Sequence, residues 1–418
     1  MKNRFNMQII LLSVICFLTG CKAKSFEEAN VTVLVDNSEK NGTQFIDDTY
    51  YVADVFGLLM LCEGDELPNY EENIQLLKGD KESVEKAIEN LSVMEQTPAV
   101  LNAIGVGDLR LAKCNEGKEK LNEALSLTED DSEKVCILNN LGNYRLYTQE
   151  DVMNGNILSR YEQALELESN PVKNIIIRMN KIVYGPLLYI DEEKPISYIK
   201  AEFEQLLKDE KKVLGSNQIV EIYANTVIPF YLNEKEEDEI PFHEQALKMN
   251  HERYQFRAAD ILIYQGLVGI YHVMGDNNMA LEYSDELIKA VDGFLSDIDP
   301  YFIRAYYDKI RLLIEEKRYD EAIQYIDILT GREDLLPNHR MNLYLKLGEI
   351  HYLQNDFTNA EEIVQEAYDI FLKAKKEEGI SEIDINEMLK IYSDSDFNHG
   401  NLDYMEWLEE QLENIGDK

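Results

Sequence analysis

A spaced pattern of small and apolar residues recurs through most of this 418-residue chain. Its clearest copy begins at Met341, with larger side chains at positions 4, 7, 11 and 24 and small ones at positions 8, 20 and 27. These spacings let two consecutive helices approach closely at the small residues, while the larger residues fill the space between them. The pattern predicts consecutive helical hairpins. Further frames begin at Pro98, Val135, Val220, Ile261 and Ile303.

The copy at Met341 resembles the tetratricopeptide repeat. Leu347, Gly348 and Ala360 stand where that family has leucine, glycine and alanine. In the intervening turn, Asn355-Asp356 is suited to capping the second helix. The resemblance implies an all-α fold, a right-handed α-solenoid of tetratricopeptide-like helical hairpins. A generic all-α protein with alternating amphipathic helices is the alternative.

The frame starts are 37 to 42 residues apart, except for one gap of 85 residues that leaves room for a degenerate hairpin. These steps exceed the usual 34 residues, which indicates longer helices or loops. We expect the solenoid to cover residues 49–418, opening with a helical hairpin at 49–96. The remaining expected hairpins are 98–134, 135–171, 172–219 (degenerate), 220–260, 261–302, 303–340, 341–380 and a closing one at 386–413.

The N-terminus has the pattern of an export signal. Two basic residues precede a ten-residue apolar stretch, Ile9–Leu18, which is too short to span a bilayer and typical of a signal-peptide core. The stretch ends in Leu18-Thr19-Gly20-Cys21, which resembles the lipobox of bacterial lipoproteins. An ordinary cleaved signal with an incidental cysteine is the alternative.

The lipobox resemblance implies that residues 1–20 are a lipoprotein signal peptide and that Cys21 carries the lipid. Residues 21–48 are mostly polar and predict a lipidated N-terminus followed by a flexible tether. Because two acyl chains anchor a protein stably, we expect a lipid-anchored protein at the cell membrane, facing outside the cytoplasm.

Acidic residues outnumber basic ones by 80 to 41, so the net charge is −39. Such a surface repels phosphate backbones and anionic lipid head groups. The charge therefore excludes nucleic acid as a partner and leaves the lipid anchor as the expected contact with the membrane. We expect a protein or peptide partner, cationic or with a free carboxylate.

In the tetratricopeptide family, positions 2, 5, 9 and 12 of each first helix project into a concave groove. An asparagine amide has one acceptor and two donors, so it can hold an extended peptide backbone. Arg304 and Arg311 are suited to binding a carboxylate. For each residue singly, a solvated helix face is the alternative. The candidate groove residues are Asn102, Asn139, Asn143, Gln265, His272, Arg304, Tyr307, Arg311, Asn342 and Lys346.

The sequence contains little evidence of catalytic or metal-binding motifs. The chain has no Gly-x-Ser-x-Gly motif and no glycine-rich phosphate loop. His251-Glu252 lacks a second histidine, and the calcium-loop-like run from Asp394 has histidine where glycine is needed. We expect no enzymatic activity, no metal and no cofactor.

Three cysteines, Cys62, Cys114 and Cys136, follow the lipobox, and three thiols cannot form a fully paired disulfide framework. Buried packing cysteines are expected. The repeat register places Cys114 and Cys136 at opposite ends of a hairpin, too far apart to pair.

These features favour a membrane-anchored extracytoplasmic protein-interaction scaffold that binds a protein segment or peptide in the concave face of the repeat array. The alternative is a solute- or glycan-binding lipoprotein for uptake, which predicts a deep pocket lined by aromatic residues.

Overall fold

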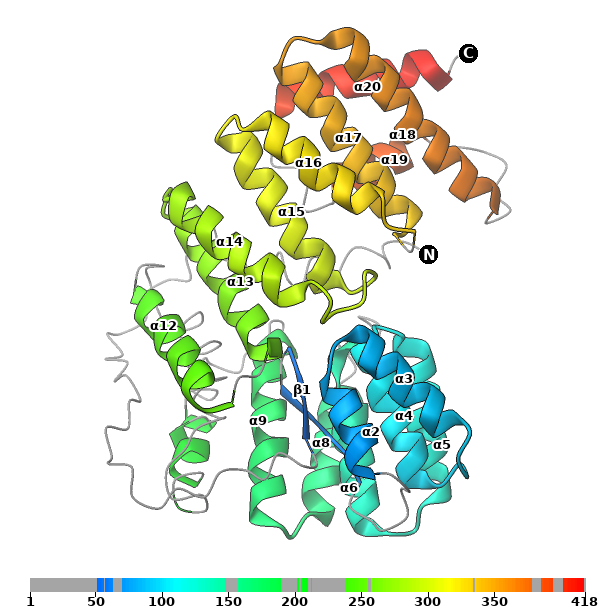
Figure 1. Cartoon of the computed structure of the whole chain (residues 1–418), viewed down its shortest axis with the longest axis vertical. Helices are drawn as coiled ribbons and strands as arrows, with labels where there is room; N and C mark the ends of the chain where they lie inside the picture. Colours follow the sequence, from blue (N-terminus) through cyan, green and yellow to red (C-terminus); the bar gives the residue numbers. More distant parts are fainter. Residues whose placement is uncertain are drawn as a thin grey trace. The chain divides into compact units, whose positions relative to one another are not determined.

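The computed structural model describes residues 51–55, 57–62, 70–146, 156–188, 201–202, 204–209, 212, 238–254, 257–333, 335–377, 385–393 and 401–416. The predicted signal peptide, Cys21, the tether and the first helix of hairpin 220–260 lie outside these residues. Two compact units are present (Figure 1). The N-terminal unit comprises Lys22–Asp276 and Lys289–Ser296, and the C-terminal unit comprises Asn277–Ile288 and Asp297–Lys418.

The N-terminal unit begins with a β-hairpin and continues as helices. Its elements are β1 (Tyr51–Asp54), β2 (Gly57–Met60), α2 (Tyr70–Lys78), α3 (Lys81–Ser92), α4 (Pro98–Arg110), α5 (Cys114–Leu127), α6 (Asp131–Leu141), η3 (Tyr144–Leu146), α8 (Asn156–Leu167), α9 (Pro171–Leu188), α12 (Ile240–Met249), η5 (Asn250–Tyr254) and α13 (Arg257–Val273).

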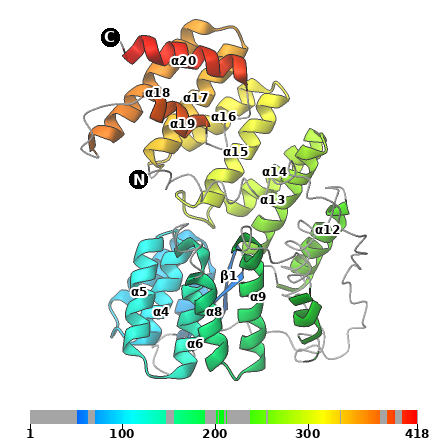
Figure 2. The ribbon, with the colours of Figure 1, turned by 180° about the vertical axis from the view of Figure 1, so that it is seen from behind.

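The C-terminal unit is helical throughout its described residues (Figure 2). Its elements are α14 (Asn277–Val291, as far as Ile288), α15 (Pro300–Glu315), α16 (Tyr319–Thr330), α17 (Pro337–Leu353), α18 (Phe357–Glu377), α19 (Ile385–Ser393) and α20 (Leu402–Gly416).

Consecutive helices pack as hairpins, α4 with α5, α6 with α8, α15 with α16 and α17 with α18. The predicted all-α fold of tetratricopeptide-like hairpins is confirmed. Several first helices begin three or four residues before the predicted frames, as α15 does at Pro300 and α17 at Pro337. These earlier starts account for part of the long repeat steps.

The turn inside three hairpins has the same backbone geometry. Ala112, Lys317 and Asn355 have φ of 58°, 57° and 62°, in the left-handed region. In each turn the next N–H bonds the carbonyl five residues earlier, at 2.8 to 2.9 Å. This is the bonding of a Schellman helix end. The predicted cap on α18 is present, because Asp356 accepts a hydrogen bond from the Asn359 N–H at 3.5 Å.

Small residues lie where the helices meet. Ala280, Ala322 and Ala360 are fully buried. A Cβ added at Gly105 on α4 would stand 2.8 Å from Leu121 Cγ on α5 and 3.3 Å from a backbone carbonyl of α5. The close approach of α4 and α5 therefore requires glycine at position 105.

The opening of the solenoid differs from the prediction of a helical hairpin at 49–96. Residues 51–60 form the antiparallel pair β1–β2, with Tyr51 opposite Met60 and Asp54 opposite Gly57. Among the described residues of this region, α2 and α3 are the helices. The run from Tyr51 to Cys62 is mostly apolar, and so short a run is compatible with either a buried strand or a buried helix. Among the described helices, none has the length and hydropathy to cross a membrane.

Asp108 on α4 gives a prediction for the pH dependence of stability. It is largely buried, and burial raises the pKa of its carboxyl group from 3.8 to about 6. Between these two values the folded state binds more protons than the unfolded state, so this carboxyl group lowers stability as pH rises from 4 to 6. Asp108→Asn should remove that dependence and raise the free energy of unfolding at pH 7 by about 2 kcal/mol. Urea titrations at pH 4 and pH 7 measure both effects; equal stabilisation at the two pH values would contradict the assignment.

Candidate functional site

The edge of β2 that faces away from β1 is bonded by asparagine side chains. Asn180 on α9 accepts from the Leu58 N–H at 3.0 Å and donates to the Leu58 carbonyl at 2.8 Å. Asn140 on α6 makes the same two bonds with Met60, each 2.7 Å long. Each amide thus reproduces the pair of hydrogen bonds that a neighbouring strand would make.

Two more asparagines give each carbonyl a second donor. Asn139 on α6 donates to the Leu58 carbonyl at 3.0 Å. Asn102 on α4 donates to the Met60 carbonyl at 3.0 Å. Two carbonyls two residues apart therefore each accept two hydrogen bonds. We call these four side chains the asparagine ladder: Asn102, Asn139, Asn140 and Asn180.

The asparagine ladder is internally bonded and closed to solvent. Asn140 donates to Asn102 Oδ1 at 2.9 Å, and Asn180 donates to Asn139 Oδ1 at 2.8 Å. The four residues are between 0% and 3% exposed. The ladder also leaves no space for a side chain at position 57, since a Cβ at Gly57 would stand 2.2 Å from Asn180 Oδ1.

The turn end of the β-hairpin is held by charge. Asp54 accepts from Asn143 Nδ2 at 2.8 Å and forms an ion pair with the Arg145 guanidinium. Both charged side chains are at most 6% exposed. The β-hairpin is therefore fastened at Asp54 and again along Leu58 and Met60.

Three predicted groove residues, Asn102, Asn139 and Asn143, bind the β-hairpin of the chain itself. The segment that these three residues bind belongs to the same chain, which the sequence did not indicate. The sequence analysis also missed Asn140 and Asn180. Asn140 falls at position 6 of its frame, away from the face positions, and Asn180 lies in the degenerate repeat, where no frame could be set.

The predicted groove residues of the C-terminal unit form a second set. On α15, Asp308 lies between two guanidinium groups, with Arg304 Nε at 3.1 Å and Arg311 at 2.8 Å. Tyr307 Oη lies 2.9 Å from His339 Nδ1, which joins α15 to α17. We call the following predicted residues the α15–α17 face: Arg304, Tyr307, Arg311 and Asn342.

Two buried polar atoms of the α15–α17 face lack a hydrogen-bond partner within the described part of the chain, Arg311 Nε and Asn342 Oδ1. One is a donor and the other an acceptor. Asn342 is 5% exposed, so solvent has little access to its amide. Buried polar groups are normally bonded, and this face therefore has unused hydrogen-bonding capacity.

The other candidates lie elsewhere. Lys346 bonds Glu349 at 2.5 Å, and Glu349 also accepts from Tyr392 on α19 and from Asn401 beside α20. The closing helices thus cover Lys346. Gln265 and His272 are half-buried on α13 and belong to neither set. His351, which stands at position 11 of the frame that begins at Met341, contacts Asp356 in the turn at 3.2 Å.

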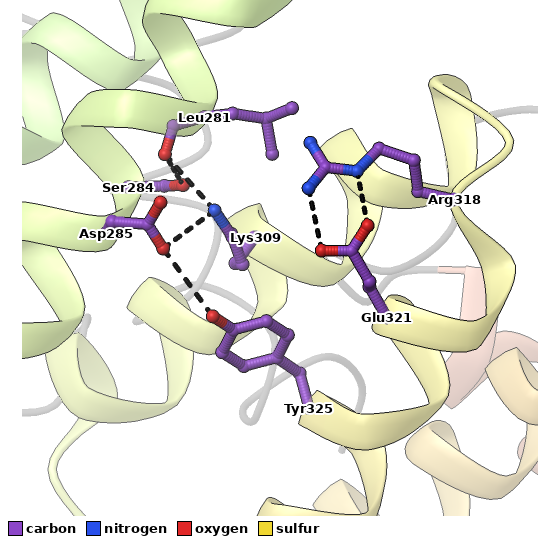
Figure 3. Close-up of polar contacts among 7 residues, drawn as sticks. All are labelled: Leu281, Ser284, Asp285, Lys309, Arg318, Glu321 and Tyr325. Carbon is purple, nitrogen blue, oxygen red and sulfur yellow. Dashed lines mark hydrogen bonds and ion pairs between the residues drawn. The ribbon is translucent and has the colours of Figure 1, made fainter.

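A polar brace connects three helices of the C-terminal unit (Figure 3). Lys309 Nζ on α15 donates to the Leu281 carbonyl at 3.2 Å and pairs with Asp285 at 2.8 Å. The Tyr325 hydroxyl on α16 donates to the same Asp285 at 3.5 Å. Nearby, Arg318 and Glu321 form an exposed ion pair with bonds of 2.6 and 2.7 Å. The brace uses Lys309 to join α15 to Leu281 and Asp285 of α14, and the Arg318 pair is separate from it.

Comparison with known proteins yields solved structures that are similar to the chain. Two structures of the human IFIT1 dimer, one with PPP-AAAA and one with m7Gppp-AAAA, are similar to the chain at 14% sequence identity. Each comparison covers 81% of this chain, and 78% and 77% of the IFIT1 chain, with TM-scores of 0.44 and 0.43. No family model and no curated protein sequence matches.

The exclusion of nucleic acid as a partner is wrong as an inference from net charge. The two IFIT1 structures contain PPP-AAAA and m7Gppp-AAAA. Net charge sums over the whole chain, whereas a ligand meets the local field of the surface that binds it. On the α15–α17 face, for example, two arginines flank one aspartate, although the chain as a whole carries −39.

Proposed function

We propose that this protein is a membrane-anchored, extracytoplasmic scaffold that binds an extended protein segment, and that the segment binds on the α15–α17 face. The observation that carries the proposal is the pair of buried, unbonded atoms on this face, Arg311 Nε and Asn342 Oδ1. A peptide unit offers the matching acceptor and donor, its carbonyl and its N–H.

The asparagine ladder supports the proposal because it is an example of the same chemistry. It is not the external site, because displacing the β-hairpin from it would cost too much free energy. It binds an extended backbone with side-chain amides at face positions. The β-hairpin that fills it buries Val52, Leu58, Leu59, Met60 and Leu61 almost completely. At about 1.5–3 kcal/mol for each side chain, displacement would cost about 10 kcal/mol. A ligand with a dissociation constant of about 1 μM supplies only about 8 kcal/mol of binding free energy, so the β-hairpin stays in place.

Binding at the α15–α17 face requires local side-chain movement to expose Arg311 Nε and Asn342 Oδ1, but it does not require displacement of a packed β-hairpin. An unbonded buried polar group costs about 1–3 kcal/mol, and a bound segment would recover that free energy at Arg311 and at Asn342. Arg304 and Arg311 share the single carboxylate of Asp308. This arrangement fixes both guanidinium groups and keeps their planar donors oriented for a ligand.

The test uses the full-length protein in detergent micelles and peptides selected from a random display library. Arg311→Met should weaken the selected peptides by about tenfold or more, the expected loss of one charge-assisted hydrogen bond. Asn342→Leu should weaken them similarly. Arg318→Met is the matched control, because Arg318 is an arginine at the N-cap of the adjacent helix α16 with an exposed ion pair, and it should leave affinity unchanged. Fluorescence anisotropy measures all four proteins.

Two results would contradict the proposal. Peptide affinity that is equal in wild type and Arg311→Met would place the site elsewhere. Tight binding of a single-stranded RNA oligonucleotide, lost in Arg311→Met while no peptide is selected, would replace a protein segment with nucleic acid as the ligand.

The anchor part of the proposal is supported by the sequence Leu18-Thr19-Gly20-Cys21. In a bacterial host fed an alkyne-tagged palmitate, the wild-type protein should carry the tag and sediment with membranes. Cys21→Ser should abolish the tag and release most of the protein into the soluble fraction, because two acyl chains supply the membrane affinity. Cys16→Ser, within the predicted signal, is the control and should change neither readout. Retention of the tag in Cys21→Ser would contradict lipidation at this residue.

A further inference from the structure

Two cysteines meet where the β-hairpin joins α6. Cys62 follows Met60 by two residues, and Met60 is bonded by Asn140 of α6. Cys136 lies one helical turn before Asn140 on the same helix. The two thiols are hydrogen-bonded to each other, and the residues are 1% and 0% exposed. The asparagine ladder therefore fixes the position of Cys62 against Cys136.

We propose that Cys62 and Cys136 form a disulfide bond that covalently fastens the β-hairpin to α6. Both residues are thiols and not a disulfide in this structure, so the bond requires an oxidant. A disulfide-bearing oxidant supplies it by thiol–disulfide exchange. One cysteine thiolate attacks the oxidant and releases one of its thiols. The second cysteine then displaces the other oxidant thiol from the mixed disulfide. Two protein thiols lose two electrons and two protons, and the oxidant disulfide becomes two thiols.

Cys114 provides an internal comparison for the Cys62–Cys136 pair. Cys114 begins α5 and is half-buried, whereas Cys136 and Cys62 are buried in contact. Among the three described cysteines, a hydrogen bond joins Cys62 to Cys136, so native contact favours this pairing over the two that involve Cys114. The hydrogen bond from Cys136 and burial raise the pKa of the Cys62 thiol. Since the thiolate is the reacting species, the bond forms during folding or opening rather than in the closed native state.

The proposed disulfide bond would add a further point at which the β-hairpin is attached to the helices. Asp54 is held at the turn end by Arg145 and Asn143, and Leu58 and Met60 are held by the asparagine ladder. A bond at Cys62 secures the end where the chain leaves β2. The inference does not depend on the proposed function, because it concerns the occupied ladder and not the α15–α17 face.

The test is refolding of the full-length protein in a buffer of reduced and oxidised glutathione. Free thiols are then alkylated, and peptides are mapped by mass spectrometry without reduction. We expect a cross-linked peptide pair containing Cys62 and Cys136 to predominate, with Cys114 alkylated. Cys114→Ser should give the same cross-link. The oxidised protein should melt about 5–10 °C higher than the reduced protein, and Cys62→Ala with Cys136→Ala should remove that redox dependence.

Two outcomes would overturn the inference. One is alkylation of Cys62 and Cys136 in the refolded protein while the same buffer oxidises a reference dithiol protein. The other is a distribution of the three pairings among Cys62, Cys114 and Cys136 that equals the distribution obtained in 8 M urea as the denaturing reference, since native contact would then favour none of them. Failure of peptide binding to the α15–α17 face would affect neither readout.

Discussion

Asn140→Ala should lower the free energy of unfolding by about 3–5 kcal/mol, which is at the upper end for a single polar residue. Asn140 accepts from the Met60 N–H and donates to the Met60 carbonyl and to Asn102. Alanine leaves the Met60 N–H without its partner in a closed site. The Met60 carbonyl keeps only its bond from Asn102. The cost is therefore the desolvation of buried groups, rather than the small net value of an exchanged hydrogen bond.

Chemical denaturation followed by circular dichroism measures this change. Asn122→Ala is the matched control, because Asn122 is an exposed residue of α5 whose amide bonds only the Lys118 carbonyl at 2.8 Å. It should change stability by less than about 0.5 kcal/mol. Comparable losses in the two variants would mean that the asparagine ladder contributes no more than an exposed helical amide.

The helical hairpins could be predicted because their signal is local. The spacing of Leu347, Gly348 and Ala360 determines which residues of two adjacent helices meet, and this spacing is contained in about 30 residues of a repeat. The turns recur even without glycine, as Lys317 and Asn355 show by adopting positive φ. Close packing of the hairpin imposes the turn geometry on whichever residue occupies the position.

The asparagine ladder could not be predicted because its members converge from distant segments. Asn102, Asn140 and Asn180 come from three helices, α4, α6 and α9, and their common ligand precedes all of them in the chain. The sequence indicated that Asn102, Asn139 and Asn143 are suited to an extended backbone. It could not indicate that the backbone is that of Leu58 and Met60, because the apolar run from Tyr51 to Cys62 is ambiguous between helix and strand.

The two sets of face residues differ in how far their polar groups are satisfied. In the N-terminal unit, the amides of the asparagine ladder bond the internal strand and one another. In the C-terminal unit, Arg311 Nε and Asn342 Oδ1 remain unbonded within the described residues. Since unbonded buried groups are costly and rare, this difference is the reason for proposing ligand binding at the second set and not at the first.

Arg145→Met should destabilise the protein by about 3–5 kcal/mol, because it leaves the Asp54 carboxylate buried without its ion-pair partner. Both side chains are at most 6% exposed, so water cannot replace the guanidinium. Asn143 still donates to Asp54 at 2.8 Å, but one neutral amide compensates only part of the charge. Chemical denaturation at pH 7 measures the loss.

The double variant Asp54→Leu with Arg145→Met separates the attraction of the pair from the cost of isolating one charge. Neither residue is then charged, so no ion has to be desolvated, and stability should return to within about 2 kcal/mol of the wild type. Recovery would mean that the ion pair contributes little net stability. Its effect would then be to raise the free energy of any conformation in which the turn end of the β-hairpin is separated from Arg145. If the double variant is instead as unstable as Arg145→Met, the loss arises from packing at the turn and not from an unpaired charge.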